Sequence, residues 1–274
     1  MLRNNQKYEG YIGEKYMIYF SDLDRTLIYS DKFINEETEQ VCIEILDGRE
    51  ISYMSPKSID ILKDILKKKK FIPTTTRSIE QYKRIMFMQN DINFEWSIVS
   101  NGGNILHNGK IFEPWNKVLQ QKLKSCTSLK DVMNHFKDNY SDTEGILKMR
   151  DVDDVFFYIV VDRDIFDENS LDSFESYLKK SGWNVYVSGR KIYFIPEVVT
   201  KESAIEYLTS YLKEEKFEAL GDSIMDINML KASNKGYIPA NSYIAMETQS
   251  DEGLYVSQGE GFKGIEEILC IINE

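Results

Sequence analysis

Short apolar runs alternate with amphipathic stretches along most of the chain. Four runs have the length and composition of buried strands, at residues 16–21, 71–72, 96–99 and 217–220. A helix is predicted from Ser55-Pro56, a cap followed by a first-turn proline, to the lysine run Lys67–Lys70. Further helices are predicted at about 79–89 and at Lys201–Leu212. This alternation predicts an α/β fold with a parallel sheet.

Two β-hairpins interrupt the alternation. The runs VCIEIL and REISYM flank Asp47-Gly48, and WNVYVS and KIYFIP flank Gly189-Arg190. The second hairpin closes a block in which the pattern differs from the rest of the chain. The pattern in this block predicts a polar helical stretch at 116–138, strands at 146–150 and 155–162, and a helix at about 168–180. It indicates a small α+β unit inserted in a larger α/β chain.

Composition sets limits on the function. The chain has 274 residues, 42% of them hydrophobic, which suffices for one large domain or for a core plus a smaller domain. Its net charge of −11 disfavours nucleic acids and anionic membranes as partners. Three scattered cysteines and an N-terminus without an apolar segment favour a reduced, cytoplasmic protein. Two histidines are too few for a multi-histidine zinc site, so any metal is expected on oxygen ligands.

Polar residues follow several of the predicted strands directly. They are Asp22, Thr74–Thr76, Asn101–Gly103 and Gly221-Asp222. In an open parallel sheet the carboxyl ends of the strands border one crevice. We therefore expect these segments to converge, although they lie up to 200 residues apart.

The pair Asp22 and Asp24 has three interpretations. Aspartate is common in turns and helix caps. A calcium loop begins in a similar way, but Leu27 stands where that loop needs glycine and no helix precedes it. A catalytic pair is the third: one carboxylate attacks phosphorus, and the other protonates the leaving alcohol and then deprotonates water. The apolar strand before Asp22 favours the catalytic interpretation.

The other segments supply what such a pair needs. Asp222 and Asp226, four residues apart at a helix start, could cap that helix or, with Asp22, form an oxygen site suited to Mg²⁺. Thr75 lies at a strand-to-helix turn, where hydroxyl and N–H groups can bind phosphate. Lys201 is predicted at a helix start, where the dipole disfavours a cation unless acids or a phosphate face it.

Together and in this order, the four segments resemble the motifs of the haloacid dehalogenase-like (HAD) phosphohydrolase superfamily. Asp22-Leu23-Asp24-Arg25-Thr26 is similar to the first motif, Thr75 to the second, Lys201 to the third and Gly221-Asp222-Ser223 with Asp226 to the fourth. SNGG at 100–103 and KESAIEYL resemble the Cof-type, class IIB branch, which includes sucrose-phosphatase-like enzymes. The resemblance implies a Rossmann-like parallel-sheet core at 1–111 and 196–274, and an inserted α+β cap of the C2 type at 112–195.

The resemblance also implies a Mg²⁺-dependent phosphatase and a role for each motif residue. Asp22 is the expected nucleophile and Asp24 the general acid/base, while Thr75 and Lys201 hold the transferring phosphoryl group. Mg²⁺ is expected on Asp22, the Asp24 backbone carbonyl, Asp222 and Asp226. Substrate contacts are expected from the residues around the second motif and the SNGG segment, namely Thr76, Arg77, Asn101 and Gly102.

Three positions depart from the pattern of the superfamily. Arg25 and Thr76 stand where glycine is frequent, and Met225 replaces an asparagine that commonly helps to position phosphate. These departures leave the nucleophile, the acid/base and the metal ligands in place. Met225 favours one alternative, a non-catalytic phospho-ligand sensor.

The expected function is an aspartyl-phosphate-forming hydrolase acting on a small phosphorylated metabolite, such as a sugar phosphate. A phosphomutase of the same superfamily is a second alternative, because it shares the same intermediate. Arg163, Arg190 and Lys191 of the inserted block are candidates to contact the distal part of the substrate. The sequence does not specify the oligomeric state.

Overall fold

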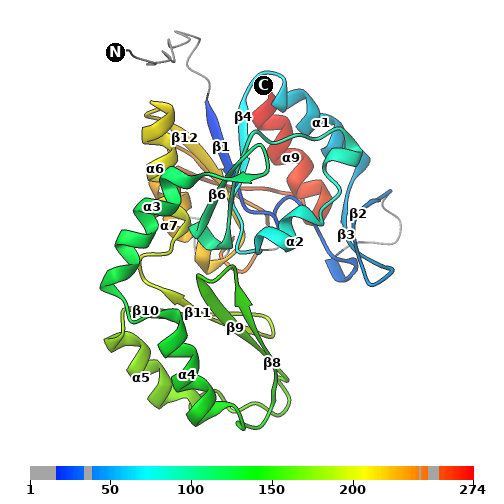
Figure 1. Cartoon of the computed structure of the whole chain (residues 1–274). Helices are drawn as coiled ribbons and strands as arrows, with labels where there is room; N and C mark the ends of the chain where they lie inside the picture. The colour runs from blue at the N-terminus through cyan, green and yellow to red at the C-terminus, as the bar shows by residue number, and fades with distance from the viewer. Residues whose placement is uncertain (1–16, 34–38, 241, 246–252) are drawn as a thin grey trace, which may run out of the picture.

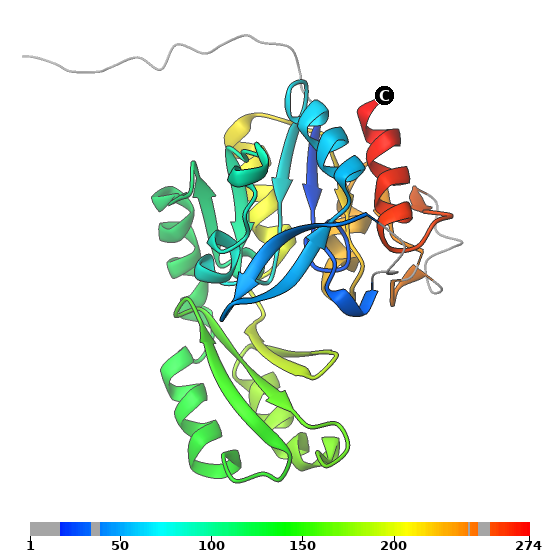
Figure 2. The same cartoon turned by 90° about the vertical axis from the view of Figure 1, so that its right-hand side faces the viewer.

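A five-stranded parallel sheet forms the centre of the protein (Figure 1, Figure 2). The computed structural model describes residues 17–33, 39–240, 242–245 and 253–274. The strand order is β14-β13-β12-β1-β4, with β1 (Ile18–Ser21), β4 (Lys70–Pro73), β12 (Phe217–Leu220), β13 (Gly236–Ile238) and β14 (Leu254–Val256). The α/β prediction is confirmed. The first strand was expected from residue 16, which lies outside the described residues.

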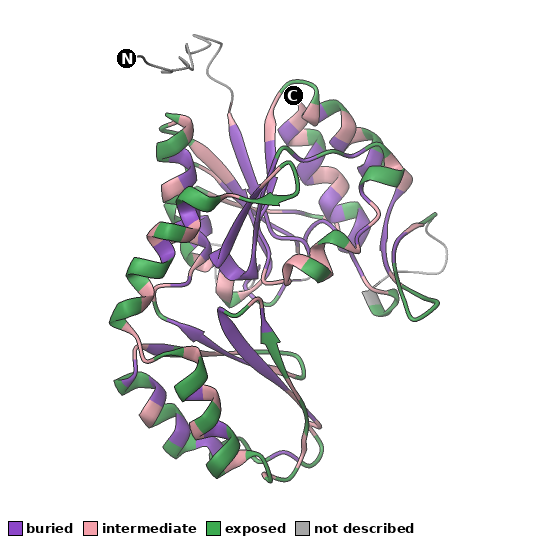
Figure 3. Cartoon of the chain, viewed as in Figure 1, coloured by how far each residue is buried: buried purple, intermediate pink, exposed green. Residues whose placement is uncertain are grey.

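Helices cover both faces of this sheet (Figure 1). The helices α1 (Pro56–Leu66) and α9 (Gly261–Asn273) lie on one face, and α6 (Lys201–Leu212) and α7 (Ile227–Ala232) lie on the other. Successive side chains of β1 point to opposite faces: Ile18 and Phe20 pack in the α6–α7 core, and Tyr19 packs in the α1–α9 core. Because β1 is buried on both faces, the residue that follows it is held rigidly (Figure 3).

Two smaller β units flank the central sheet. The strands β5 (Trp96–Val99), β6 (Asn104–His107) and β7 (Lys110–Ile111) form an antiparallel sheet, joined to the end of β4 by a parallel bridge between Thr74 and Ile98. The strands β2 (Val41–Leu46) and β3 (Arg49–Met54) form the predicted hairpin. Its two turn residues, Asp47 and Gly48, have positive φ angles of 52° and 76°, which match the twist of a tight hairpin.

A separate four-stranded antiparallel sheet lies below the core in Figure 1. Its order is β10-β11-β9-β8, with β8 (Ile146–Val152), β9 (Phe156–Val161), β10 (Trp183–Ser188) and β11 (Lys191–Pro196). The helices α4 (Leu129–Tyr140) and α5 (Asp172–Lys180) pack on one face through the rings of Phe136, Phe157, Phe174 and Phe194. We call these four strands and two helices the cap.

The helix α3 (Glu113–Lys122) contacts the core rather than the cap. Trp115 in this helix donates a hydrogen bond from Nε1 to the Gly102 carbonyl at 2.9 Å, and its ring lies 5.1 Å from that of Tyr207 in α6. The division into 1–111, 112–195 and 196–274 stays a prediction. We propose from the contacts of Trp115 that the inserted unit begins after α3.

Several helices differ from the sequence prediction. The stretch 116–138 is two helices, α3 and α4, because the chain turns at Leu123–Ser125 and Ser128 caps a new helix through the Asp131 N–H. The helix predicted at 79–89 is α2 (Ile79–Lys83) alone, because Met86 N–H donates to the Ile43 carbonyl of β2 and leaves the helix. The helix α1 ends at Leu66, before the lysine run.

The remaining short elements are 3₁₀ turns. They are η1 (Asp31–Phe33), η2 (Met88–Asn90), η3 (Ser100–Gly102), η4 (Leu123–Ser125), η5 (Glu168–Leu171) and η6 (Ile224–Asp226). Among the helices of the described residues, none has the length and apolar character that crossing a bilayer requires.

Candidate active site

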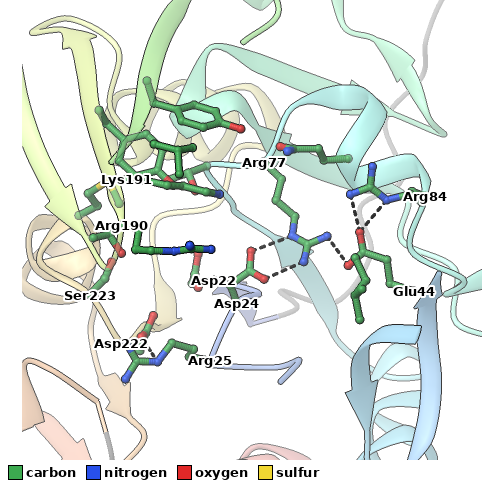
Figure 4. Close-up of a pocket in the computed structure, with 18 residues that line it drawn as sticks. Asp22, Asp24, Arg25, Glu44, Arg77, Arg84, Arg190, Lys191, Asp222 and Ser223 are labelled. Carbon is green, nitrogen blue, oxygen red and sulfur yellow. Dashed lines mark hydrogen bonds and ion pairs between the residues drawn. The ribbon is translucent and has the colours of Figure 1, made fainter. Parts of the chain in front are cut away.

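A cavity of about 420 Å³ lies between the carboxyl ends of the central strands and the cap (Figure 4). The expected convergence of the strand ends is observed here. Thr74 N–H donates to the Ser21 carbonyl at 2.7 Å, and Asn101 N–H donates to the Thr75 carbonyl at 2.9 Å. Five of the ten site residues predicted around the motifs line the cavity: Asp22, Asp24, Thr76, Arg77 and Asp222.

Asp22 is fixed by the strand that precedes it. Its N–H donates to the Leu220 carbonyl at 2.9 Å, which continues the β1–β12 pairing by one residue. Lys201 Nζ donates to Oδ1 of Asp22 at 2.6 Å. No described residue donates a hydrogen bond to Oδ2 of Asp22, which is thus the oxygen available to a ligand.

Arg25 has a backbone conformation that explains its unusual place in the motif. Its φ angle is 65°, in the left-handed region that favours glycine. The guanidinium Nε lies 3.7 Å from Oδ2 of Asp222 on the neighbouring strand end. An arginine is accommodated here at the cost of backbone strain, and it brings a positive charge to the acidic cluster.

Lys201 is buried between two carboxylates. The side chain is 1% exposed, and Nζ lies 2.6 Å from both Asp22 Oδ1 and Asp226 Oδ1. It is the first residue of α6, whose N-cap Thr200 accepts a hydrogen bond from Ser203 N–H. Burial disfavours the ammonium charge, but the two carboxylates outweigh it and hold the pKa of Lys201 above its usual value. The acids that a lysine needs at a helix start are therefore present.

Asp226 is committed to hydrogen bonds on both oxygens. Oδ1 accepts from Lys201, and Oδ2 accepts from Ser223 Oγ at 2.7 Å and Ser223 N–H at 3.0 Å. Gly221 makes room for it, because a Cβ at that position would lie 2.4 Å from Cβ of Asp226. Asp226 thus positions Lys201 and the loop after β12.

Asp22, Asp222 and Asp226 form a buried group of carboxylates. Ligand oxygens of the three lie within 4.8 Å of one another. Burial raises the pKa of Asp22 to about 7, and repulsion from Asp226 and Asp24 adds to this effect against the opposing Lys201. Burial and the charges of Asp22 and Asp226 raise the pKa of Asp222 well above its usual value. The nearby cations Lys201 and Arg25 offset only part of the negative charge of these three acids. The cluster therefore fits a hard cation bound through oxygen.

Asp24 is held by an arginine. Arg77 donates to both oxygens of Asp24, from Nε and from the terminal nitrogen NH2, at 2.7 Å each (Figure 4). Desolvation by the cavity wall raises the pKa of Asp24, but this bidentate pair outweighs it and holds the pKa below its usual value. The Asp24 side chain is 51% exposed, so the pair faces the cavity.

Arg77 is itself positioned by Glu44 of β2, a contact that the sequence did not reveal. The Glu44 side chain is fully buried, accepts from Arg77 NH1 and Arg84 Nε at 2.8 Å each, and accepts from Ser52 Oγ at 2.7 Å. Strand alternation alone would not identify Glu44, because irregular pairing between Cys42 and Ile45 turns Glu44 inward and leaves Ile45 exposed. Arg84 carried no sequence signal either.

Five of the ten site residues predicted around the motifs do not line the cavity: Lys201 and Asp226, described above, and Thr75, Asn101 and Gly102. Thr75 is fully buried, its N–H donates to the Ile98 carbonyl, and its Oγ1 accepts from Arg77 N–H at 3.2 Å. Asn101 Nδ2 donates to the Val199 carbonyl at 3.1 Å, just before α6. Gly102, at a φ of 94°, is so close to Thr200 that a Cβ would lie 2.1 Å from its carbonyl oxygen. Asn101 and Gly102 therefore support the start of α6, where Lys201 begins the helix.

The cap contributes residues to the opposite wall. Tyr158 and Tyr193, for which the sequence gave no indication, line the cavity together with Arg190 and Lys191. Arg163 does not line it: its guanidinium contacts Glu168 at 2.6 Å and the Gly189 carbonyl at 2.7 Å. Met225 lines the cavity beside Ser223.

The fold is similar to those of several solved phosphatases. A sucrose-phosphatase from Synechocystis sp., solved with sucrose and phosphate, is 16% identical with a TM-score of 0.67, covering 95% of this chain and 99% of the other. A HAD subclass IIB sugar phosphatase is 12% identical with a TM-score of 0.60, covering 93% and 98%. A phosphatase of the superfamily from Bacteroides thetaiotaomicron is 16% identical with a TM-score of 0.58, covering 94% and 95%. At these identities the likeness concerns the fold.

A family model gives independent sequence evidence. No curated protein sequence matches the chain significantly. The model for haloacid dehalogenase-like hydrolases matches residues 116–252, half of the chain, and this segment includes the whole cap, Lys201, Asp222 and Asp226. On the family match and the shared fold, the chain belongs to the haloacid dehalogenase-like hydrolase family.

Proposed function

We propose that the protein is a Mg²⁺-dependent phosphomonoester hydrolase that works through an aspartyl-phosphate on Asp22. One observation carries the proposal: Lys201 holds one oxygen of Asp22, while the other oxygen is available at the cavity two residues from a second carboxylate, Asp24. A nucleophile and an acid/base group at this spacing divide phosphate-ester hydrolysis into two displacements.

In the first displacement, Oδ2 of Asp22 attacks phosphorus and the ester P–O bond breaks. The leaving alkoxide takes a proton from Asp24, so that an alcohol departs. Lys201 keeps Asp22 oriented during this step, since its ammonium anchors Oδ1 at 2.6 Å. Closure of the cap over the substrate would keep water away from phosphorus at this stage.

In the second displacement, water attacks phosphorus and the bond to Asp22 breaks. Asp24 accepts the proton of that water, and inorganic phosphate leaves. The bidentate pair with Arg77 holds Asp24 as a carboxylate, the form this step needs. The first step needs the protonated form, so we propose that Arg77 releases Asp24 when substrate binds.

The phosphoryl group and the metal have candidate ligands in the chain. Thr75 and Lys201 are proposed to hold the phosphoryl oxygens, Lys201 through its ammonium and Thr75 through its hydroxyl. Mg²⁺ would be held by Asp22, Asp222 and the Asp24 carbonyl. Asp226 belongs to the same group of carboxylates, and its Oδ1 accepts a hydrogen bond from Lys201. When bound, Mg²⁺ would offset the repulsion between Asp22 and the phosphate and polarise the phosphoryl oxygens. The repulsion that raises the pKa values of Asp22 and Asp222 supports this assignment.

The proposed substrate is a small phosphorylated metabolite, such as a sugar phosphate. A cavity of about 420 Å³ is in the range that suits a small molecule. The phosphatases of similar fold, one of them solved with sucrose and phosphate, support the same class.

Phosphate release from a panel of sugar phosphates, nucleotides and p-nitrophenyl phosphate, with and without Mg²⁺, tests the proposal. We expect release that requires Mg²⁺ and is abolished in Asp22→Asn, a variant of nearly equal shape whose fold can be checked by circular dichroism. Release that survives in Asp22→Asn would refute the aspartyl-phosphate. A folded protein that binds Mg²⁺ but releases no phosphate would favour a mutase or a phospho-ligand sensor.

A further inference from the structure

The cavity carries a positive charge excess in a protein that is strongly acidic overall. Five cationic side chains and four carboxylates line it, although the whole chain has a net charge of −11. The five cations are Arg25, Arg77, Arg84, Arg190 and Lys191. Such a local reversal of sign attracts anionic ligands.

The carboxylates of the cavity already have cationic partners. Each of the four lies within 4.0 Å of a lysine or arginine nitrogen. The pairs are Asp22 with Lys201, Asp24 with Arg77, Glu44 with Arg77 and Arg84, and Asp222 with Arg25. Within the part of the chain that the structure describes, Arg190 and Lys191 form no ion pair. The unpaired charge therefore lies on the cap wall.

Lys191 occupies a costly place for a cation without a counter-ion. It is half-buried, and its Nζ lies 5.0 Å from the centre of the Tyr158 ring and 6.0 Å from that of Tyr193. The two rings attract the ammonium, but burial lowers the pKa of Lys191 below its usual value. An anion at this wall would supply the missing counter-charge.

Lys191 lies on the side of the cavity where the leaving group would depart. The charges that act on it are those of Asp24, Arg77 and Glu44, and Asp24 is the proposed proton donor to the leaving oxygen. Figure 4 shows Lys191 across the cavity from Asp222, and Arg190 extending from the cap toward Asp22 and Asp24. The two cap cations thus face the substrate beyond its reacting phosphate.

We propose that the substrate carries a second anionic group, a carboxylate or a second phosphate, which Lys191 and Arg190 bind on the cap side of the cavity. This inference rests on the proposed function and narrows its substrate class to phosphomonoesters with another negative charge. An uncharged distal group would leave both cations desolvated without a partner when the cap closes. A sugar monophosphate without a further charge is therefore a poor fit.

Matched substrates test the second charge. sn-Glycerol 3-phosphate and 3-phosphoglycerate differ by the exchange of a hydroxymethyl group for a carboxylate, and fructose 6-phosphate and fructose 1,6-bisphosphate differ by one phosphate. We expect kcat/KM to be at least about tenfold higher for the anionic member of at least one pair, mainly through KM, as a charge-assisted hydrogen bond implies. The pair that shows the preference identifies the second anion as carboxylate or phosphate.

Variants at Lys191 connect that preference to the cap. In Lys191→Met the ratio of kcat/KM between the two members should fall about 10- to 100-fold, and Lys191→Arg should keep most of it. The ratio isolates the second anion, because a loss at the reacting phosphate affects both members equally. Lys179→Met removes an exposed cap lysine that does not line the cavity and should leave the ratio unchanged.

Equal kcat/KM for charged and uncharged members, or a ratio that Lys191→Met leaves unchanged, would overturn the inference while phosphatase activity stands. The opposite case is a protein that has the anion subsite but no phosphatase activity. Binding of the same compounds to Asp22→Asn, measured by calorimetry, identifies this case. Suppose that the unsubstituted protein hydrolyses no compound, yet 3-phosphoglycerate or fructose 1,6-bisphosphate binds at least tenfold more tightly than the less charged member of its pair. If Lys191→Met then removes this difference in affinity, the proposed function fails and the anion subsite stands. Equal binding there would also overturn the subsite.

Discussion

Lys201→Met removes the cation that bridges the two buried acids Asp22 and Asp226, and it keeps most of the length and the apolar character of the side-chain stem. Each contact of Nζ is 2.6 Å long. At an effective dielectric constant of about 20, one such contact contributes about 6 kcal/mol of Coulomb energy. The cost of burying the ammonium offsets several kcal/mol of the pair. The net loss expected on breaking a buried pair is about 3–5 kcal/mol at pH 8.

The loss should depend on pH. Asp22 has a pKa raised to about 7 even with Lys201 present, so without the lysine it is protonated more easily still. At pH 6 the variant can neutralise Asp22, and less repulsion from Asp226 then remains. We expect the destabilisation at pH 6 to be smaller than at pH 8.

Thermal unfolding in Mg²⁺-free buffer at both pH values measures this effect. A loss of about 3–5 kcal/mol corresponds to a Tm lower by at least about 6 °C for a chain of this size. Lys122→Met is the matched control, because its exposed Nζ contacts Ser203 in the same first turn of α6, and its Tm should change by less than about 2 °C. Equal Tm values for the two variants at pH 8 would refute the idea that Lys201 neutralises a buried acid pair.

Three further outcomes are expected. Arg77→Gln should raise the pKa of Asp24, because it removes the bidentate pair that holds this pKa low; an Asp24 pKa that stays unchanged in a titration followed by NMR would contradict that role of Arg77. Gly102→Ala should cost at least about 2 kcal/mol in unfolding free energy, because the new Cβ would lie 2.1 Å from a carbonyl oxygen, whereas Gly48→Ala, also at positive φ but in open space, should cost about 1 kcal/mol. Without Mg²⁺, Asp22 binds more protons in the native than in the unfolded protein between about pH 4 and 7. The Tm of the protein relative to that of Asp22→Asn should therefore fall as pH rises through this window. Added MgCl₂ should raise the Tm by more at pH 8 than at pH 5.

The sequence predicted those parts of the fold that depend on local pattern. The two hairpins and the strand Phe217–Leu220 have the expected bounds, because alternation and turn residues determine them locally. The helix Lys201–Leu212 does as well, because Thr200 caps it and its apolar face is continuous. The break between α3 and α4 was missed, because nothing in the polar stretch before Ser128 interrupts the helical spacing.

The sequence predicted those residues of the candidate site whose positions depend on the end of a single central strand. Asp22 and Asp222 lie at the cavity because Asp22 follows β1 directly and Asp222 follows β12 after one glycine, Gly221. Glu44 could not be predicted, because its inward position depends on an irregular register within the hairpin and on two arginines from another segment. The contact between Gly102 and the start of α6 joins residues 98 positions apart, and no local pattern reports it.

The turn between β10 and β11 lets substrate choice diverge separately from the chemistry. Ser188 precedes this turn and Arg190 lies in it; both are exposed at the cavity wall, whereas the cap interior depends on rings such as Phe157 and Phe194. Substitutions at exposed positions of this kind usually change stability by less than about 0.5 kcal/mol. A duplicated gene could therefore acquire a new leaving-group preference through one or two changes at this turn, while every strand-end residue at the reacting centre is inherited intact.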